Sequence, residues 1–323
     1  MYETPFHSKS LSDFSFLVTG GAGFIGSHLV EYLLKHGAKR VRVLDNLLTG
    51  SKENVKLFSN HPSYEFFHGD IRNADDCKNA CSGIDFVLHQ AALASVQRSM
   101  NDPVTTHEIN ANGFLNMLIA TRDANVKRLV YASSSSVYGD HPDLPKQENK
   151  TGNPLSPYAV SKKTNELYAF VFATAFGMEI IGLRYFNIFG PRQDPNGPYA
   201  AVIPAFIREM KESKSPVIFG DGSQTRDFTF VENAIQANIK AMFASKPEAL
   251  NRVYNVACGE TFSILSIFEI IRSTLSLDLK PRFETARKGD ILHSTADITL
   301  AHEMFGYRPQ ISLKQGIQIL LSL

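Results

Sequence analysis

Three glycines at the junction of a short apolar strand and an amphipathic helix restrict the possible folds of this chain more than any other feature. Residues 14–19 form the predicted strand, Gly20, Gly23 and Gly26 follow it, and the helix runs to Lys35. Glycine permits a tight turn and a close approach of the backbone to a ligand, and the free N–H groups of the following helix attract phosphate. A glycine triplet alone is weak evidence, but between a strand and a helix it predicts a dinucleotide site.

The ends of the next three predicted strands add polar and small residues to this site. A strand over residues 40–44 ends at Asp45, about twenty residues beyond the glycines, where a carboxylate bonds the ribose hydroxyls and favours NAD over NADP. A turn at the strand end that uses Asp45 before Asn46 is the alternative. The predicted cofactor ligands from the turn and the strand ends are Gly20, Gly23, Phe24, Ile25, Gly26, Asp45, Asn46, Asp70, Ile71, Gln90, Ala91 and Ala92.

Strands and helices alternate as far as residue 186, which predicts an α/β fold built on a doubly wound parallel sheet. A long helix is expected over residues 103–125. Beyond residue 186 the pattern loosens, and residues 225–230 are expected to form a strand. The expected domains are a Rossmann-like NAD-binding domain over residues 1–186, joined by a segment near 226–256, and a smaller α/β substrate-binding domain mainly over 187–323.

A tyrosine and a lysine four residues apart, Tyr158 and Lys162, share one face of a helix predicted over residues 155–176. Ser156 is a suitable N-cap and Gly177 ends the helix. A lysine cation beside a phenol lowers the pKa of tyrosine from about 10 towards neutrality, so the pair can exchange a proton at physiological pH. An ordinary solvated pair on the helix surface is the alternative.

Hydroxyl and guanidinium groups occupy further positions where a ligand is expected. A strand over residues 128–132 opens into the serines of residues 133–136, at the sheet edge where ligands bind in doubly wound folds. A run of serines is equally typical of a loop. In the second half, Arg192, Arg226 and Arg287 are candidate phosphate ligands, because a guanidinium bonds two oxygens at once. Taken singly, each arginine is more simply a surface residue.

The composition excludes several classes of function. With 33 basic and 32 acidic side chains the formal net charge is +1, so nothing draws the whole chain to nucleic acid or to an anionic membrane. Three cysteines indicate a reducing compartment, and Cys77 with Cys81 makes half a metal site at best, so no metal is expected. Residues 1–13 are polar and no apolar run approaches about 18 residues, which predicts a cytoplasmic protein.

In their order along the chain these motifs resemble those of the extended short-chain dehydrogenases/reductases. The matching positions are the glycine turn, residues 45–47, residues 69–70, Ser134, Tyr158 with Lys162, and residues 184–187. Within that family the chain is most similar to the nucleotide-sugar 4-epimerases, and above all to the bacterial UDP-N-acetylglucosamine 4-epimerases of polysaccharide biosynthesis. The stretches that carry this closer resemblance are residues 89–93, 156–160, 192–204 and 289–294.

The resemblance implies that Ser134, Tyr158 and Lys162 are catalytic. Tyr158 would take the proton from the sugar O4 while the C4 hydride passes to NAD⁺, and Ser134 would bond O4. Lys162 would hold the nicotinamide ribose and, with Tyr158 and Tyr185, complete the cofactor ligands. Because NAD is regenerated in each cycle, it is expected to stay tightly bound. The positions that match UDP-sugar ligands are Ser95, Ser134, Ser135, Asn187, Gln193, Arg226, Arg287, Asp290 and Ser294.

Two departures bear on the reaction and the substrate. Sugar 4,6-dehydratases carry Asp-Glu directly after the catalytic Ser or Thr, and related decarboxylases carry Glu nearby, where this chain has Ser135 and Ser136. Epimerases restricted to plain hexoses carry a tyrosine where this chain has Ser294, so room is left for a 2-acetamido group. Ala94 stands where glycine is expected and narrows that pocket. The resemblance implies a 4-epimerase that interconverts UDP-N-acetylglucosamine and UDP-N-acetylgalactosamine, with UDP-glucose and UDP-galactose as a second pair.

Two other functions remain open at this point: a nucleotide-sugar dehydratase or decarboxylase on the same scaffold, and an NAD-binding module without catalysis.

The helices over residues 103–125 and 155–176 resemble those that pair across a dimer in this family, which implies a homodimer. Their apolar positions are equally explained by packing against the sheet.

Overall fold

A seven-stranded parallel sheet forms the centre of the structure, a computed structural model that describes residues 1–196, 200–285 and 292–322. The strand order is β11-β6-β5-β4-β1-β2-β3, which confirms the predicted doubly wound α/β fold. Strands covered on both faces are continuous apolar runs, and all five residues of β1 are buried. The strands are β1 (Ser15–Thr19), β2 (Arg40–Asp45), β3 (Tyr64–His68), β4 (Phe86–His89), β5 (Arg128–Ser134), β6 (Ile180–Tyr185) and β11 (Arg252–Val256).

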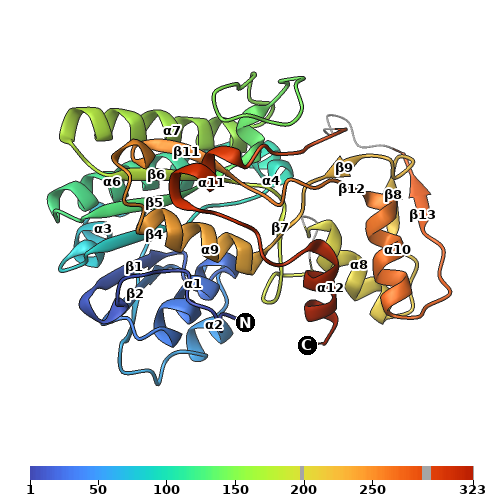
Figure 1. Ribbon diagram of the computed structural model, residues 1–323, viewed down its shortest axis with the longest axis horizontal. Helices are drawn as coiled ribbons and strands as arrows, with labels where there is room; N and C mark the ends of the chain where they lie inside the picture. The colour runs from blue at the N-terminus through green and yellow to red at the C-terminus, as the bar shows by residue number, and fades with distance from the viewer. Residues whose placement is uncertain (197–199, 286–291, 323) are drawn as a thin grey trace.

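Helices cover both faces of this sheet (Figure 1). On one face α1 (Phe24–Lys35) packs against α9 (Val231–Met242), and on the other α3 (Ala74–Cys81) and α7 (Pro157–Phe176) pack against α6 (Gly113–Asp123). Successive side chains of a strand point to opposite faces. Phe16 and Val18 of β1 accordingly join the apolar cluster under α1 and α9, and Leu17 joins the separate cluster under α3 and α6.

The strand order reverses beside β1, and this places the site. The chain builds β1, β2 and β3 towards one edge and then crosses to β4 on the other side of β1. Thr19, the last residue of β1, is therefore paired with Leu44 of β2 on one side and His89 of β4 on the other. A crevice opens at the carboxyl ends of the strands at such a reversal. The glycine turn and Asp45 lie at these ends.

The helix that carries Tyr158 has the predicted caps, Ser156 and Gly177, although it begins at Pro157, two residues later than predicted. The Oγ of Ser156 accepts the N–H of Ala159 at 3.1 Å, and Pro157 occupies the first turn. Gly177 ends the helix with φ +66°, a left-handed conformation that glycine adopts without strain. The 20 residues of α7 lead from the crevice back along the strands to the start of β6.

Residues 103–125 do not form the single regular helix that the sequence predicts. Instead α5 (Pro103–His107) passes through a π-helical turn over Glu108–Asn112 into α6. Within this turn the amide of Asn110 both accepts the N–H of Leu93 at 2.7 Å and donates to the Leu93 carbonyl at 3.1 Å. Such turns occur frequently at functional sites, and here the extra residue positions the loop that follows β4.

The residues after β6 form a smaller unit to one side of the sheet, on the right in Figure 1, and return to the sheet through α9 and β11. Residues 225–230 are two short strands, not the single strand predicted, because the buried Asp227 between them turns its carboxylate to the N–H groups of Cys258 and Gly259, both at 2.9 Å. The other elements are α2 (Lys52–Lys56), α4 (Val96–Asn101), β7 (Ile188–Phe189), α8 (Val202–Lys211), β8 (Val217–Phe219), β9 (Thr225–Arg226), β10 (Thr229–Phe230), β12 (Phe262–Ser263), α10 (Ile264–Thr274), β13 (Arg282–Glu284), α11 (Thr299–Phe305) and α12 (Leu313–Ser322).

Within the described ranges, no helix has the length and apolar character needed to cross a bilayer. The same residues contain no group of three or more His, Cys, Asp or Glu side chains placed to hold a metal ion.

A buried ion pair joins α7 to the sheet directly beneath the catalytic serine proposed from the sequence. Arg184 of β6 is 2% exposed and bonds both carboxylate oxygens of Glu166 at 2.8 Å. The hydroxyl of Ser133 donates to the same carboxylate at 2.6 Å, and Arg184 also donates to the carbonyl of Glu148 at 3.0 Å. A bidentate pair with further hydrogen bonds satisfies two charges that would otherwise be costly to bury.

We expect Glu166→Gln to lower the free energy of unfolding by about 3–5 kcal/mol, because it leaves the Arg184 guanidinium buried without its counter-charge. The matched control is Glu269→Gln, which breaks the exposed i,i+3 pair with Arg272 on α10 and should cost about 0–1 kcal/mol. Urea unfolding of both variants checks this expectation. Equal, small losses in the two variants would show that the buried pair does not anchor α7.

Candidate active site

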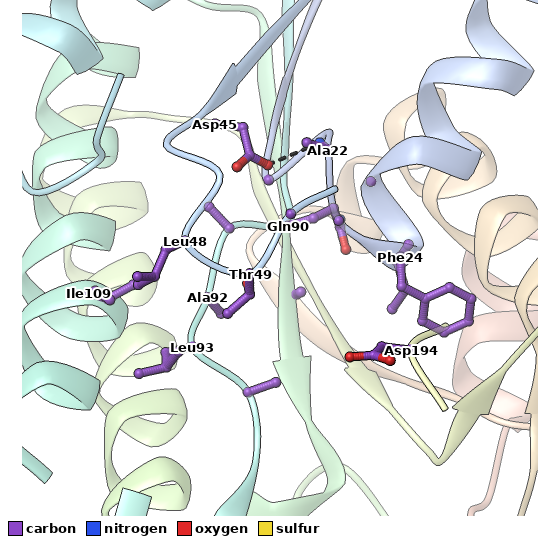
Figure 2. Close-up of a pocket in the computed structure, with 18 of the residues that line it drawn as sticks. Ala22, Phe24, Asp45, Leu48, Thr49, Gln90, Ala92, Leu93, Ile109 and Asp194 are labelled. Atoms are coloured by element: carbon purple, nitrogen blue, oxygen red, sulfur yellow. Dashed lines mark hydrogen bonds between the residues drawn. The ribbon is translucent and has the colours of Figure 1, made fainter. Parts of the chain in front are cut away.

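A cavity of about 800 Å³ lies at the carboxyl ends of the parallel strands, at the reversal of strand order. Figure 2 shows residues that line it, with Asp45 and Ala22 joined by a hydrogen bond at one end and Phe24 beside Asp194 at another. Every residue that the sequence predicts as a cofactor ligand lines this cavity, Tyr158, Lys162 and Tyr185 included. The sequence therefore places these side chains together correctly, although contact with a cofactor stays a prediction.

The glycine turn leaves no room for side chains. A Cβ on Gly26 would lie 2.1 Å from the carbonyl oxygen of Gly20, and a Cβ on Gly20 would lie 2.7 Å from the amide nitrogen of Ala91. Gly20 also has φ +69°, which other residues rarely adopt. Gly23, at the N-cap of α1, presents bare backbone to the cavity. The turn and the start of α1 thus fit a dinucleotide pyrophosphate.

The carboxylate of Asp45 is held at the end of β2 by backbone N–H groups. Its Oδ2 accepts from Ala22 at 3.0 Å and its Oδ1 accepts from Leu47 at 2.8 Å. Burial raises the pKa of Asp45, and these two hydrogen bonds oppose the rise. A fixed carboxyl group at this place fits the ribose hydroxyls of NAD, as predicted.

The next strand end carries a second carboxylate with a different environment. Asp70 pairs with Arg72 at 2.6 Å and accepts from the Asn46 amide at 2.8 Å. The Arg72 pair holds the pKa of Asp70 at about 2. Asp70 and Asn46 both line the cavity, so the pair forms a polar wall at its adenosine end.

The three residues that the sequence proposes as catalytic meet in this cavity from two elements. Ser134 ends β5, and Tyr158 and Lys162 project from the first two turns of α7. The Nζ of Lys162 is buried and donates to the carbonyl of Ala132 at 2.8 Å. It lies 5.9 Å from the centre of the Tyr158 ring. The cavity therefore brings a phenol, a hydroxyl and an amine to one wall.

The pKa of Tyr158 corrects one expectation. The sequence predicts that Lys162 lowers it towards neutrality, but burial raises it above the ordinary value, and the opposing contribution comes from a hydrogen bond with Ser134. Burial also lowers the pKa of Lys162 to about 8. The reason is geometric, since the amine is directed to the Ala132 carbonyl on β5 and not to the phenol oxygen.

A hydrogen-bond chain that the sequence did not reveal supports the cavity floor. The Tyr185 hydroxyl donates to Gln90 at 3.0 Å and accepts from Asn238 at 2.7 Å, and Gln90 donates back to Asn238 at 3.1 Å. Asn238 is fully buried on α9. The one sequence signal that could have revealed this hydrogen-bond chain is the asparagine itself, a polar residue at an inward position of an amphipathic helix. The lining residues missed by the sequence reading are Ala22, Leu44, Leu48, Thr49, Gly50, Ser51, Asn54, Gly69, Leu93, Ile109, Ile188, Asp194 and Pro195.

The predicted substrate ligands divide between two cavities. Ser134, Asn187 and Gln193 line the main cavity, and Asn187 also lines a second cavity of about 440 Å³ together with Arg226. Ser95, Ser135 and Ser294 line neither of the two, although Ala94 lines the first and the N–H of Ser294 donates to the Thr225 carbonyl next to Arg226. Arg287 and Asp290 lie outside the described residues.

Arg192 lines the main cavity, and its role as a phosphate ligand stays a prediction. Its guanidinium bonds the carboxylate of Glu31 and the ring of His28, and it donates to the Ser27 carbonyl at 3.3 Å. All three partners belong to α1. The side chain is thus committed to holding its own loop against that helix.

Comparison with known proteins agrees with the fold. Residues 16–257 match the NAD dependent epimerase/dehydratase family. A UDP-glucose 4-epimerase of Mycolicibacterium smegmatis is 36% identical over 308 residues, covering 93% of this chain and 95% of the relative.

Two solved structures are similar over almost their whole length. A UDP-N-acetylglucosamine 4-epimerase from Methanobrevibacter ruminantium, in complex with UDP-N-acetylmuramic acid, superposes with a TM-score of 0.90 at 39% identity, covering 96% of this chain and 97% of the other. A UDP-glucose 4-epimerase of Thermus thermophilus, in complex with NAD, has a TM-score of 0.85 at 34% identity, with 95% and 98% coverage. The chain belongs to the NAD dependent epimerase/dehydratase family.

Proposed function

We propose that this protein is a UDP-sugar 4-epimerase that interconverts UDP-N-acetylglucosamine and UDP-N-acetylgalactosamine, and also accepts UDP-glucose and UDP-galactose. The observation that carries the proposal is the convergence of Ser134, Tyr158 and Lys162 on one wall of a cavity whose other end fits NAD. The second cavity shares Asn187 with the first and is lined by Arg226, so it is suited to the nucleotide end of the substrate.

The residues of this wall divide the chemistry among them. NAD, when bound, supplies the acceptor and donor of the hydride at the sugar C4. Tyr158 takes the proton from O4 and returns it on the way back, and the hydroxyl of Ser134 bonds O4 during both transfers. Because burial raises the pKa of Tyr158, a nearby positive charge is needed to make phenolate accessible at neutral pH. Lys162 makes no hydrogen bond to the phenol oxygen, but its amine lies 5.9 Å from the centre of the Tyr158 ring, and we propose that it supplies part of this charge through space.

The arrangement of carboxylates supports epimerisation over elimination or decarboxylation. Among the described lining residues, the carboxylates are Asp45 and Asp70 at the adenosine end and Asp194 on the loop after β7. Glu166 lies beneath Ser134, but Arg184 binds both of its oxygens. Residues 135 and 136 are serines, so no acid directly follows Ser134 in the chain to assist loss of water or of CO₂ from the sugar.

The proposed preference for acetylated sugars depends on the small side chain of Ser294, which lies next to the second cavity without lining it. Ser294 is 9% exposed and lies beside Thr225, one residue before Arg226. A serine there occupies far less volume than the tyrosine of the hexose-restricted enzymes that the chain resembles. The solved relative at 39% identity, which is a UDP-N-acetylglucosamine 4-epimerase, supports the same substrate.

We also propose that the protein is a homodimer formed through α5 and α7. Val160, Leu167 and Val171 form a stripe along α7, and all three are exposed. Val104 of α5, 66% exposed, continues this apolar surface across a shallow hollow shared with Val160. A continuous exposed apolar patch on a globular domain marks an interface, and two-fold pairing would let one helix face cover its own copy.

Replacing Tyr158 with Phe should reduce kcat by about 100- to 10,000-fold, because only the proton-transferring oxygen is removed. NAD should remain bound, which absorbance of the purified variant checks. Tyr168→Phe on the exposed part of the same helix is the matched control and should keep full turnover. Full turnover by the Tyr158 variant would exclude the phenol as the proton acceptor.

Proton NMR of UDP-N-acetylglucosamine and UDP-glucose, incubated in parallel with the purified protein, should show C4 epimers of both sugars. Ser294→Tyr should lower kcat/KM for the acetylated sugar by about 10- to 200-fold relative to the plain hexose. The reason is that the added ring would fill the space that the 2-acetamido group of the sugar needs. Turnover of UDP-glucose alone by the parent protein would refute the acetyl preference. Release of water or CO₂ in place of an epimer would refute the reaction itself.

Leu167→Glu should convert the dimer into monomers, since the substitution places a charge in the middle of the apolar stripe on α7. Light scattering coupled to size-exclusion chromatography measures the change in mass. Leu265→Glu introduces the same charge at a partly exposed leucine on α10 and should leave the mass unchanged. If both variants retain the parent mass, the α7 face is not the interface.

A further inference from the structure

Three apolar side chains among the first eleven residues are packed into the core. Tyr2 is fully buried, and Phe6 and Leu11 are 8% and 1% exposed. The rings of Tyr2 and Phe6 both contact Tyr32 of α1. Residues 1–11 precede the part of the chain that matches the family. The ring of Tyr2 meets those of His28 and Tyr32 edge to face, with centroids 6.0 and 5.8 Å away.

Tyr2 adopts a strained backbone conformation that its neighbours enforce. Its φ is +66°, which is rare for an aromatic residue. Its N–H donates to Glu232 on α9 at 3.1 Å, and its carbonyl lies 3.1 Å from the Nε2 of His36 at the end of α1. Such a conformation persists only where the surroundings over-determine it, and it often accompanies a functional role.

The ring of His28 connects Tyr2 to a loop beside the cavity through hydrogen bonds at its two nitrogens. The Nε2 of His28 lies 2.9 Å from the carbonyl oxygen of Pro191, which can only accept, so Nε2 carries the proton. The Nδ1 is then the acceptor for the Tyr2 hydroxyl at 2.7 Å and for the guanidinium of Arg192. Burial lowers the pKa of His28 to about 3, so the neutral ring required by this arrangement is present at physiological pH.

The loop over residues 191–195 is part of the cavity wall. Gln193, Asp194 and Pro195 all line the cavity, and Figure 2 shows Asp194 beside Phe24 at the start of α1. Arg192 has φ +64° and is bonded to Glu31 on α1. From the other side, Arg208 of α8 donates to the Pro195 carbonyl at 2.7 Å. The loop thus bridges the sheet and the smaller unit. It is attached to α1 by the bond of His28 to the Pro191 carbonyl and by the bond of Arg192 to Glu31.

We propose that Tyr2 is a positioning residue for the cofactor site. By fixing the His28 ring, it holds the loop over residues 191–195 against α1, and this attachment slows the dissociation of NAD. The glycine turn at the start of α1 and this loop line the same cavity, so a dinucleotide held there would leave more readily when the loop moves away. Without the Tyr2 hydroxyl, His28 keeps only Arg192 as a donor to Nδ1, and its ring is less firmly oriented towards Pro191.

Tyr2→Phe tests this inference because it removes one hydroxyl and keeps the buried ring. Protein loaded with radiolabelled NAD is chased with excess unlabelled NAD, and the dissociation rate should rise about 3- to 10-fold, as expected for one lost hydrogen bond. The control is Tyr32→Phe, whose hydroxyl also binds the N-terminal segment, at Phe6 and His7, but does not touch His28. This variant should release NAD at the parent rate.

A double-mutant cycle separates positioning from general stabilisation. His28→Leu should speed NAD release at least as much as Tyr2→Phe, and adding Tyr2→Phe to it should change the rate by less than about 2-fold, because both act through one ring. Thermal midpoints of all variants show whether each remains folded. The inference is overturned if Tyr2→Phe and Tyr32→Phe speed release equally, if neither does, or if Tyr2→Phe has its full effect without His28.

Discussion

The contact between the start of α1 and the glycine turn is the constraint on which the rest of the site depends. The turn is closed so tightly that a single methyl group on Gly26 would meet the Gly20 carbonyl at 2.1 Å. This closeness seats α1 on β1 and directs its first N–H groups into the cavity. The same helix then carries His28 and Glu31, which hold Arg192. The close contact between Gly26 and Gly20 therefore positions both the start of α1, where a phosphate is expected, and the loop that borders it.

A buried network joins this frame to the wall that carries Ser134, Tyr158 and Lys162. Ser133 bonds Glu166 of α7, which is paired with Arg184 of β6, so the end of β5 and the middle of α7 are fixed to each other. Ser134 is the next residue on β5, and Lys162 lies one turn before Glu166 on α7. The relative position of the hydroxyl and the amine is thus set by an ion pair that neither of them contacts, which limits how far either can move during a reaction.

Local patterns in the sequence predicted the parts of the fold that local interactions determine. The strands β1 to β6, the glycine turn and the caps of α7 follow from apolar runs, glycine and an N-cap serine, so they could be predicted from the sequence to within about two residues. The π-turn at residues 108–112 could not, because Asn110 is drawn to Leu93, which lies 17 residues away in the chain. The pKa of Tyr158 and the partners of Arg192 likewise depend on burial and on distant elements. Spacing between residues in the sequence contains no information about either.

Four of the nine described non-glycine residues with positive φ lie at or next to the cavity, and each of these four is restrained by a hydrogen bond. Leu47, Ser95, Asn187 and Arg192 have positive φ, and each lines the cavity or adjoins a residue that does. A conformation of this kind costs on the order of 1–3 kcal/mol.

Each of these residues has a hydrogen bond that compensates for the strain. The N–H of Leu47 donates to Asp45, the Oγ of Ser95 accepts from Arg98, the amide of Asn187 donates to the Asp227 carbonyl, and the Arg192 guanidinium binds Glu31. The bonds reach different elements, so no single movement relaxes all four loops. The cavity is therefore shaped before any ligand arrives, and binding free energy is not needed to order its walls.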